Sequence, residues 1–281
     1  ARILHGENRI TPIGERTGLF MDLGLVRLVK DPSTGQGSFL PVTRDDQVIR
    51  LAGQAAHFDL SEYGVPENLQ RALDIATELA VAAAYEALRD AGIPLQRVYQ
   101  QTATGKRVPK GWALPEALRD ETGIVFGSAF PGYDSLVKLI GQNGADENGH
   151  FDRRFLFQVL TMGHSQLAQL IGARGPNTHV NAACASATQA IAVGQDWIRT
   201  GRCKRVIVVS ADNVTGENLF RWIGGGFMAA GAASTHDVVD ETALPFDARR
   251  HGLVLGMGAN AVVLESAATA EERAVVPLAE L

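Results

Sequence analysis

Cys184 lies in the part of the sequence best suited to covalent chemistry. Residues 175–190 read GPNTHVNAACASATQA. Residues 178–181 predict a short strand that ends just before the cysteine, and the helical spacing of small residues at 186–200 predicts a helix that follows it at once. The sequence therefore predicts a strand-to-helix turn that holds the thiol beside a helix N-terminus.

A turn of this kind would make Cys184 a candidate nucleophile. Free N–H groups and the dipole at a helix N-terminus favour the thiolate, which is the attacking form, and can also stabilise an oxyanion. Ala183 and Ala185 flank the sulfur and leave room for an incoming chain. Free cysteine is also common as a small buried core residue, and the turn alone favours that alternative. The surrounding segments must therefore decide between the two.

Strand-like and helical segments alternate along the chain. Buried strands are predicted at 122–127, 205–211 and 260–265, with shorter ones within 19–30 and at 48–52. Helices are predicted at 67–91, at 153–173 as one or two, and at 220–233. Residues 96–115 are polar and aperiodic, which predicts an exposed insertion. The alternation predicts a layered α/β fold with a mainly parallel sheet.

Composition and charge exclude several classes of protein. The chain has 281 residues, 46 % of them hydrophobic, and a net charge of −5, which argues against a nucleic-acid-binding protein. Two cysteines are too few for a disulfide framework and show no metal-ligand spacing, so a reducing, cytoplasmic setting is expected. No apolar run is long enough to predict a membrane span.

One basic cluster has two interpretations. Its members are Arg199, Arg202, Lys204 and Arg205. The favoured interpretation is the cationic end of a helix, which the helix dipole stabilises. The alternative is a docking site for an acidic carrier protein.

Several segments together resemble the β-ketoacyl synthases. Residues 175–190 are similar to the active-site elbow of that family, in which a T/N-A-C-A/S-S/T motif follows G-P-N. Four further segments agree in order and spacing: 58–66 (FDLSEYGVP), 122–132 (TGIVFGSAFPG), 225–234 (GGFMAAGAAS) and 245–265 (PFDARRHGLVLGMGANAVVLE). Each motif alone is moderately specific, but the ordered set is strong. The resemblance spans 58–265, with the insertion near 96–115.

The resemblance implies a thiolase-like, layered α-β-α fold of which this chain is the N-terminal half of a pseudo-duplicated architecture. It implies an N-terminal segment at 1–57, partly strand and loop, and the nucleophile half at 58–281. Cys184 would accept an acyl group from the phosphopantetheine of an acyl carrier protein and condense it with a malonyl-type thioester, in fatty-acid or polyketide synthesis. Phe227 would lie near the acyl chain. The strand before Cys184 would lie near a homodimer interface, and no bound cofactor or metal is implied.

Departures from the family limit this inference. The H-G-T-G-T and N-x-G-H motifs, which carry the family's two further catalytic histidines, do not occur. The resemblance covers about the first two thirds of a synthase, so we expect a piece of a larger synthase that needs the missing C-terminal half to condense. His251 and Met257 stand where the family has acidic residues.

Other interpretations remain open beside the synthase. A thiolase-like acyltransferase is disfavoured by the P-F-D segment at 245–247, and a noncatalytic scaffold or dimerisation half is disfavoured by Cys184. His179, five residues before Cys184, is expected to be a strand residue or an interface contact rather than a base. Cys203 is expected to be structural. The glycines at 252–258 do not predict a nucleotide site, because a strand-like run follows them where a helix is needed.

Overall fold

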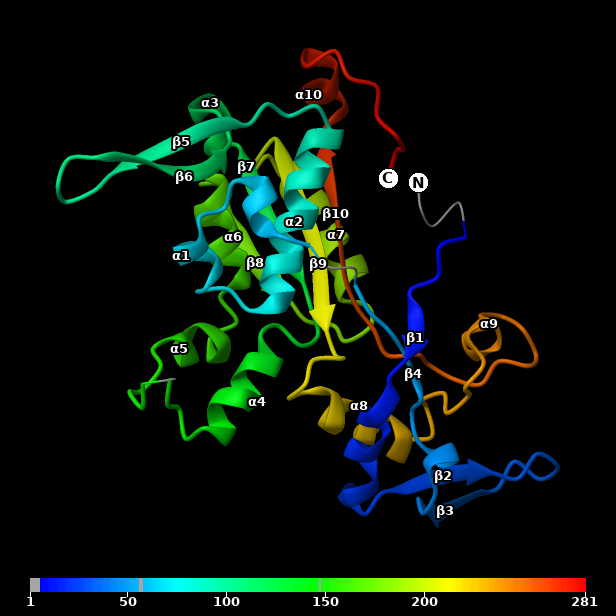
Figure 1. Ribbon diagram of the computed structural model, residues 1–281. Coiled ribbons are helices and arrows are strands. Elements are labelled where there is room, and N and C mark those ends of the chain that lie inside the picture. The colour runs from blue at the N-terminus through cyan, green and yellow to red at the C-terminus, as the bar shows by residue number, and fades with distance from the viewer. Residues whose placement is uncertain (1–5, 56–57, 147) are drawn as a thin grey trace. The chain divides into compact units, whose positions relative to one another are not determined.

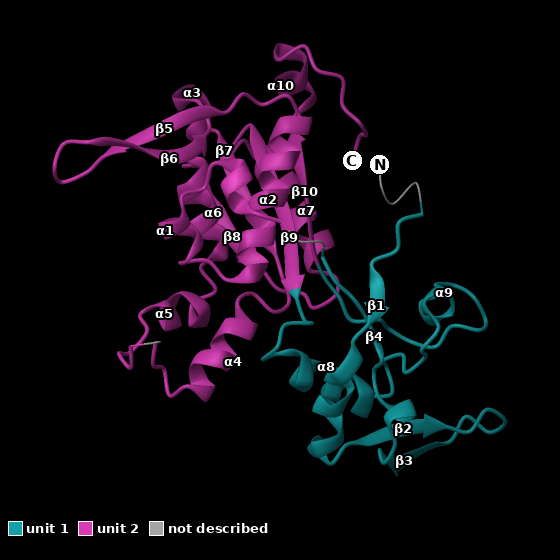
Figure 2. Ribbon diagram, viewed as in Figure 1, with its two compact units in different colours: residues 1–57, 213–257 teal, residues 58–212, 258–281 magenta. Residues whose placement is uncertain are grey.

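The computed structural model describes residues 6–55, 58–146 and 148–281 (Figure 1). The chain divides into two compact units, the first made of residues 1–57 and 213–257 and the second of 58–212 and 258–281 (Figure 2). The chain leaves the second unit at the end of one strand and re-enters it at the start of another. The domain boundaries expected from the sequence, 1–57 and 58–281, stay a prediction, because compact units need not coincide with the domains of a family.

The second unit contains a four-stranded sheet in the order β10-β9-β7-β8. Its strands are β7 (Thr122–Gly127), β8 (Asn177–Val180), β9 (Arg205–Asn213) and β10 (Met257–Glu265). β7 runs parallel to β8 and to β9. Every residue of β7 is buried, as expected for a parallel strand covered on both faces. The strands predicted at 122–127, 205–211 and 260–265 are thus confirmed.

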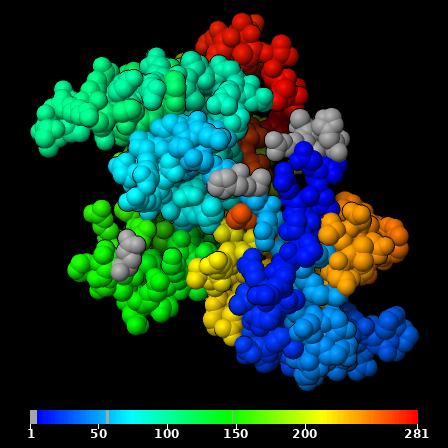
Figure 3. Space-filling view, in the orientation of Figure 1, coloured from blue at the N-terminus to red at the C-terminus, as the bar shows by residue number. Residues whose placement is uncertain are grey.

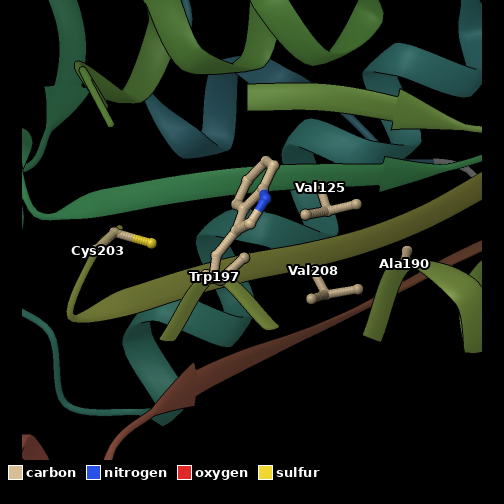
Figure 4. Close-up of a cluster of buried hydrophobic side chains, with 6 residues drawn as sticks. Val125, Ala190, Trp197, Cys203 and Val208 are labelled. Carbon is tan, nitrogen blue, oxygen red and sulfur yellow. The ribbon is translucent and has the colours of Figure 1, made fainter. Parts of the chain in front are cut away.

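The helices of the second unit pack on this sheet or lie beside it. They are α2 (Ile75–Asp90), α4 (Tyr133–Gly141), α5 (Arg154–Val159), α6 (Gly163–Ile171) and α7 (Ser186–Arg199), with the short α1 (Glu67–Gln70), α3 (Glu116–Arg119) and α10 (Ala267–Glu272). α7 packs on β7 and β8. Its Ala190 and Trp197 share a buried apolar cluster with Val125 and Val208 from the sheet (Figure 4). Burial of this cluster fixes α7 against the strands that lead to and from it.

The helix predicted at 67–91 is interrupted. α1 ends at Gln70 and α2 starts at Ile75, because the carboxylate of Asp74 accepts hydrogen bonds from the backbone N–H groups of Ala76 and Thr77. Asp74 is therefore the N-cap of a new helix. The sequence prediction of one continuous helix was wrong at this point.

Residues 96–115 form a β-hairpin. β5 (Gln96–Gln101) pairs antiparallel with β6 (Arg107–Ala113), and a register shift lies between Val98 and Tyr99. All β5 residues except Val98 are exposed. The expected exposure is confirmed for β5 but not for Gly111, Ala113 and Leu114, which are buried at the end of β6 and just after it. The expected lack of regular structure was wrong.

The first unit contains two small antiparallel pairs. β1 (Ile10–Pro12) pairs with β4 (Leu51–Gly53), and β2 (Val26–Lys30) pairs with β3 (Gly37–Pro41). The 3₁₀ helix η2 (Gly14–Leu23) and α8 (Phe220–Ala229) pack together through Phe20 and Phe220, whose ring centroids are 5.2 Å apart. Further short helices are η3 (Asp45–Gln47), η4 (Leu60–Tyr63), which belongs to the second unit, and α9 (Val239–Thr242).

Three predicted boundaries in this first unit were inaccurate. The strand predicted at 48–52 is β4, which begins only at Leu51 and ends at Gly53. The strand predicted within 19–30 begins only at Val26, because η2 occupies 14–23. The helix predicted at 220–233 ends at Ala229, where the N–H groups of Ala232 and Ala233 both turn back to the carbonyl of Phe227. In the ranges that the structure describes, no helix combines the length and apolar character that crossing a bilayer requires.

Candidate active site

The candidate site lies where three parallel strands end. β7, β8 and β9 run in the same direction, so their carboxyl ends meet at one edge of the sheet. The loop 128–130 follows β7, and the elbow, which we define as residues 181–185, joins β8 to α7. Ligands of open α/β sheets bind outside the carboxyl ends of the strands. The sequence-predicted strand-to-helix turn is confirmed, and it lies at this edge.

Cys184 is exposed within the elbow. All five elbow residues are exposed, and Ala185 is the N-cap residue of α7. Ala183 has a φ of 51°, in the left-handed region, which costs a residue with a β-carbon about 1–2 kcal/mol. Strain of this kind persists only where neighbouring contacts enforce it, and it is common at functional sites.

Ser186 enforces the bend from the helix side. Its hydroxyl donates a hydrogen bond to the carbonyl oxygen of Ala183 at 2.6 Å and accepts one from the N–H of Ala182 at 3.0 Å. The side chain is buried, with 3 % of the residue exposed. One hydroxyl therefore fixes two peptide groups of the elbow, the one between Asn181 and Ala182 and the one between Ala183 and Cys184.

Asn181 enforces the bend from the strand side. Its Oδ1 accepts a hydrogen bond from the N–H of Ala183, and its Nδ2 donates one to the carbonyl oxygen of Ala129, both at 3.0 Å. Ala129 belongs to the loop after β7. The elbow is thereby tied to the neighbouring loop at the same sheet edge.

Asp212 organises that neighbouring loop. Its carboxylate accepts hydrogen bonds from Ser128 Oγ (2.7 Å), the N–H of Ala129 (3.0 Å) and the N–H of Phe130 (2.8 Å). Asp212 lies near the end of β9. The carboxylate of Asp212, near the end of β9, thus fixes the loop that follows β7. Asn181 in turn joins this loop to the elbow by a hydrogen bond.

Close backbone packing also positions the start of α7. A β-carbon added at Gly127, the last residue of β7, would lie 2.7 Å from the carbonyl oxygen of Ser186. Such a contact is shorter than any ordinary packing distance, so only glycine fits here. The sheet therefore approaches the first turn of α7 more closely than any side chain would allow.

Residues 43–270 match the protein-family model described as "Beta-ketoacyl synthase, N-terminal domain". The chain belongs to the β-ketoacyl synthase family. A curated relative, 3-oxoacyl-[acyl-carrier-protein] synthase 2 of Staphylococcus aureus, is 26 % identical over 235 residues, which are 83 % of this chain and 52 % of that protein. The tetracenomycin polyketide synthase ketoacyl synthase alpha subunit of Streptomyces glaucescens is 28 % identical over 236 residues, 83 % of this chain and 51 % of that protein.

A solved structure of a β-ketoacyl synthase from Burkholderia phymatum STM815 has the same fold. The TM-score is 0.62 at 22 % identity, and the match covers 96 % of this chain and 62 % of the other. This supports the thiolase-like α/β fold expected from the sequence. The chain spans about half the length of the curated relatives it matches.

Within this family fold, His179 is engaged away from Cys184. Its Nε2 lies 3.0 Å from the carbonyl oxygen of Ser128, and its ring meets Phe126 edge-on. A carbonyl can only accept, so Nε2 carries the proton of this hydrogen bond. His179 is a strand residue that holds the loop after β7, in agreement with the interpretation favoured from the sequence. Burial lowers the pKa of the neighbouring His164, whose Nδ1 lies 3.2 Å from the carbonyl of Thr161.

The second cysteine has the structural environment expected from the sequence. Cys203 is 7 % exposed and belongs to the apolar cluster of α7 and the sheet. Burial raises the pKa of its thiol, although a backbone hydrogen bond from Gly123 opposes the effect. A thiol of this kind is mostly protonated at neutral pH and is a poor nucleophile.

The remaining predicted residues lie in different places. Ala183 and Ala185 flank Cys184 in the elbow, as the sequence requires. Phe227 is on α8 in the first unit, so its place near an acyl chain stays a prediction. His251, which stands where the family has an acidic residue, stacks on His236 with ring centroids 4.0 Å apart. Met257 is the first residue of β10.

The basic cluster is not one cationic surface. Arg205 begins β9, is 2 % exposed and pairs with Glu265 at 2.8 Å. Lys204 pairs with Glu121, and the guanidinium of Arg202 lies over the ring of Trp197. Only Arg199, the last residue of α7, fits the interpretation of a cationic helix end.

The sequence did not single out Asn181, Ser186 or Asp212 as functional. A signal was present, because each is a polar residue that directly borders a buried strand or a helix start. Asn181 and Asp212 bond to the loop after β7, which is distant from both in the chain, so no local pattern identifies these contacts. Among the residues that the structure describes, no cluster of three His, Cys, Asp or Glu side chains is arranged to hold a metal ion.

Proposed function

We propose that this chain is the nucleophile-bearing part of a ketosynthase and carries an acyl group on Cys184. The observation that supports the proposal most is the elbow itself. It presents an exposed thiol next to a strained residue, at the start of a helix, with both sides of the bend fixed by buried or interlocking hydrogen bonds. A reactive cysteine needs this combination of access and rigid placement.

The proposed loading step is a transthioesterification. The thiolate of Cys184 attacks the carbonyl carbon of an acyl thioester and forms a tetrahedral oxyanion. The oxyanion collapses with cleavage of the original carbon–sulfur bond, and the leaving thiolate takes up a proton. The product is acyl-Cys184 and a free thiol. Covalent storage of this kind divides one difficult transfer into two easier steps.

The proposed second step is condensation. A malonyl-type thioester loses CO₂, and the resulting carbanion attacks the acyl-Cys184 carbonyl and releases the Cys184 thiolate. Because the two histidine motifs of the family are absent from the sequence, we propose that this chain loads Cys184 but needs a complementary C-terminal half to condense. The names of the relatives support an acyl carrier protein as the donor and leave both fatty-acid and polyketide synthesis as settings.

A homodimer is also part of the proposal. β8 is the last strand in the order of the sheet and leads directly into the elbow. An edge strand offers unpaired backbone groups to a second chain. Pairing there would place two elbows close to a shared interface. A proline placed at Asn177, whose N–H points away from β7, blocks edge pairing, and sedimentation of this variant tests this part separately.

Intact-protein mass after incubation with an acyl-coenzyme A thioester, followed by peptide mapping, tests the loading step. A single acyl addition on Cys184 is expected. Cys184→Ala should abolish the addition, and Cys203→Ala, the matched control, should retain it. Equal labelling of the Cys184→Ala variant contradicts the assignment. No labelling of the folded, unmodified chain favours the noncatalytic scaffold, and a β-keto product from this chain alone contradicts the need for a second half.

A further inference from the structure

The β5–β6 hairpin is positively charged in a chain that is acidic as a whole. Residues 91–115 contain Arg97, Lys106, Arg107 and Lys110 but no aspartate or glutamate. Removing these four from the chain's 26 basic residues leaves 22 against 31 acidic ones. None of the four forms an ion pair with a carboxylate in the described part of the chain.

Two guanidinium groups and two aromatic rings share one face of the hairpin. Arg97 lies opposite Trp112, and its guanidinium carbon is 5.9 Å from the ring centroid. The guanidinium carbon of Arg107 is 4.3 Å from the ring centroid of Tyr99. Both rings are partly exposed, Tyr99 at 41 % and Trp112 at 36 %. Stacking orients a guanidinium group while its N–H donors stay free for an anion.

The base of the hairpin is fixed to the second unit. The hydroxyl of Tyr85 donates a hydrogen bond to the carbonyl of Trp112 at 2.7 Å, and the N–H of Leu114 donates one to the carbonyl of Ile171. The indole lies against the backbone at Gly64, where a β-carbon would come within 2.7 Å of the ring. Beyond this base the hairpin projects from the second unit as an arm (Figures 1 and 3). A fixed arm loses little conformational freedom when it binds a partner.

We propose that this face of the β5–β6 hairpin docks an acidic α-helix of a partner protein. The guanidinium group of Arg107 lies over the ring of Tyr99, which is two residues along β5 from Arg97. At about 3.3 Å per residue, the two guanidinium groups are therefore offset by about 7 Å along the strand. Carboxylates at positions i and i+4 of an α-helix lie about 6 Å apart along its axis, so one helix face can pair with both. A guanidinium group binds a carboxylate through two parallel hydrogen bonds.

Charge favours a protein helix over a nucleic acid. A duplex requires several cations to neutralise its phosphates, and its affinity depends on how many are neutralised. The arm offers four, and the rest of the chain has an excess of acidic residues that repels a polyanion at long range. An acidic helix needs only local complementarity and contributes few charges of its own.

A labelled helical peptide with glutamates at i, i+4 and i+8 tests the proposal on the whole chain by fluorescence anisotropy. The peptide should bind, and binding should weaken about tenfold as salt rises from about 0.05 to 0.2 M. Arg97→Gln/Arg107→Gln should weaken binding about tenfold or more. The control Arg9→Gln/Arg44→Gln, which makes the same change in net charge at exposed sites of the first unit, should leave binding unchanged.

A charge-reversal variant distinguishes the loss of the binding face from a general loss of structure. Arg97→Glu/Arg107→Glu should reject the glutamate peptide and bind the matching lysine peptide. Failure to bind the lysine peptide, or undiminished binding of the glutamate peptide by Arg97→Gln/Arg107→Gln, overturns the proposal. Tighter binding of a DNA duplex that depends on the same arginines overturns it in favour of a nucleic acid. The outcome is independent of the proposed function, because loading of Cys184 from a small thioester does not involve the hairpin.

Discussion

The hydroxyl of Ser186 donates a 2.6 Å hydrogen bond to the carbonyl oxygen of Ala183, and these two residues enclose Cys184 and Ala185 in the chain. Ala183 is the strained residue of the elbow, with a φ of 51°. The first buried residue of α7 therefore stabilises the conformation that exposes the thiol. Substitutions that leave the cysteine intact should still change its reactivity.

Ser186→Ala should slow acylation of Cys184 about tenfold and lower the free energy of unfolding by about 1–2 kcal/mol, because a buried hydroxyl with two hydrogen bonds is removed. Stopped-flow mass spectrometry and urea unfolding measure the two effects. Thr188→Ala, an exposed position on the same helix, is the control and should change neither. A normal acylation rate in Ser186→Ala would show that the elbow does not depend on this hydroxyl.

Asp212→Asn should loosen the loop after β7. The carboxylate accepts three hydrogen bonds, whereas the amide has one acceptor oxygen and turns an N–H donor toward an N–H group of the loop. We expect a loss of about 1–3 kcal/mol in the free energy of unfolding. Acylation should slow as well, because Asn181 is bonded to Ala129 of this loop. The exposed Asp196→Asn serves as the control, and a stable variant that acylates normally refutes the link between Asp212 and the elbow.

The sequence predicted the elements with strong local patterns. Apolar runs such as 205–211 identify buried parallel strands, because both faces of such a strand are covered. The β5–β6 hairpin was missed because β5 is polar and mostly exposed and β6 is interrupted by Pro109 and Gly111, which are uncommon inside strands. The interruption at Asp74 was missed because apolar spacing continues across it, although aspartate before a helix is a typical N-cap.

The candidate site was predictable only in part. A cysteine between a short strand and a small-residue helix indicated the turn, and the family motifs indicated its chemistry. The hydrogen bond from Asn181 to Ala129 joins residues 52 apart in the chain, and the one from Ser128 to Asp212 joins residues 84 apart. Pairings at that separation are decided by the order of strands in the sheet, which a single sequence does not encode locally.

The ion pair of Arg205 and Glu265 should be important for stability. Both side chains are almost fully buried, at 2 % and 8 % exposure, and Glu265 also pairs with Arg273 at 3.1 Å. Glu265→Gln leaves the Arg205 charge buried without a counter-ion and should lower the free energy of unfolding by about 3–5 kcal/mol. The double variant Arg205→Met/Glu265→Leu removes both charges and should lose clearly less. If urea unfolding shows the same loss of unfolding free energy for Glu265→Gln and for the double variant, the electrostatic explanation is wrong.

Glu78 should make stability depend on pH near neutrality. Burial, and secondarily the negative charge of Asp74, raise the pKa of this half-buried carboxyl from 4.5 to about 7. Between these two pH values the folded chain binds a proton that the unfolded chain has released. The contribution of Glu78 to stability is therefore fully present below about pH 4.5 and is lost as pH rises through about 7.

Glu78→Gln should remove this dependence. Relative to the unmodified chain, the variant should be more stable at pH 8 by about 1–2 kcal/mol, a figure reduced from the full pKa shift because solvent screens a half-exposed group. Thermal unfolding between pH 5.5 and pH 8 measures the difference, with the exposed Glu280→Gln as the control. Because glutamine cannot ionise, the melting temperatures of the variant should fall less than those of the unmodified chain as pH rises across this interval. Parallel curves for the two proteins would mean that the Glu78 carboxyl ionises as freely in the folded chain as in the unfolded one.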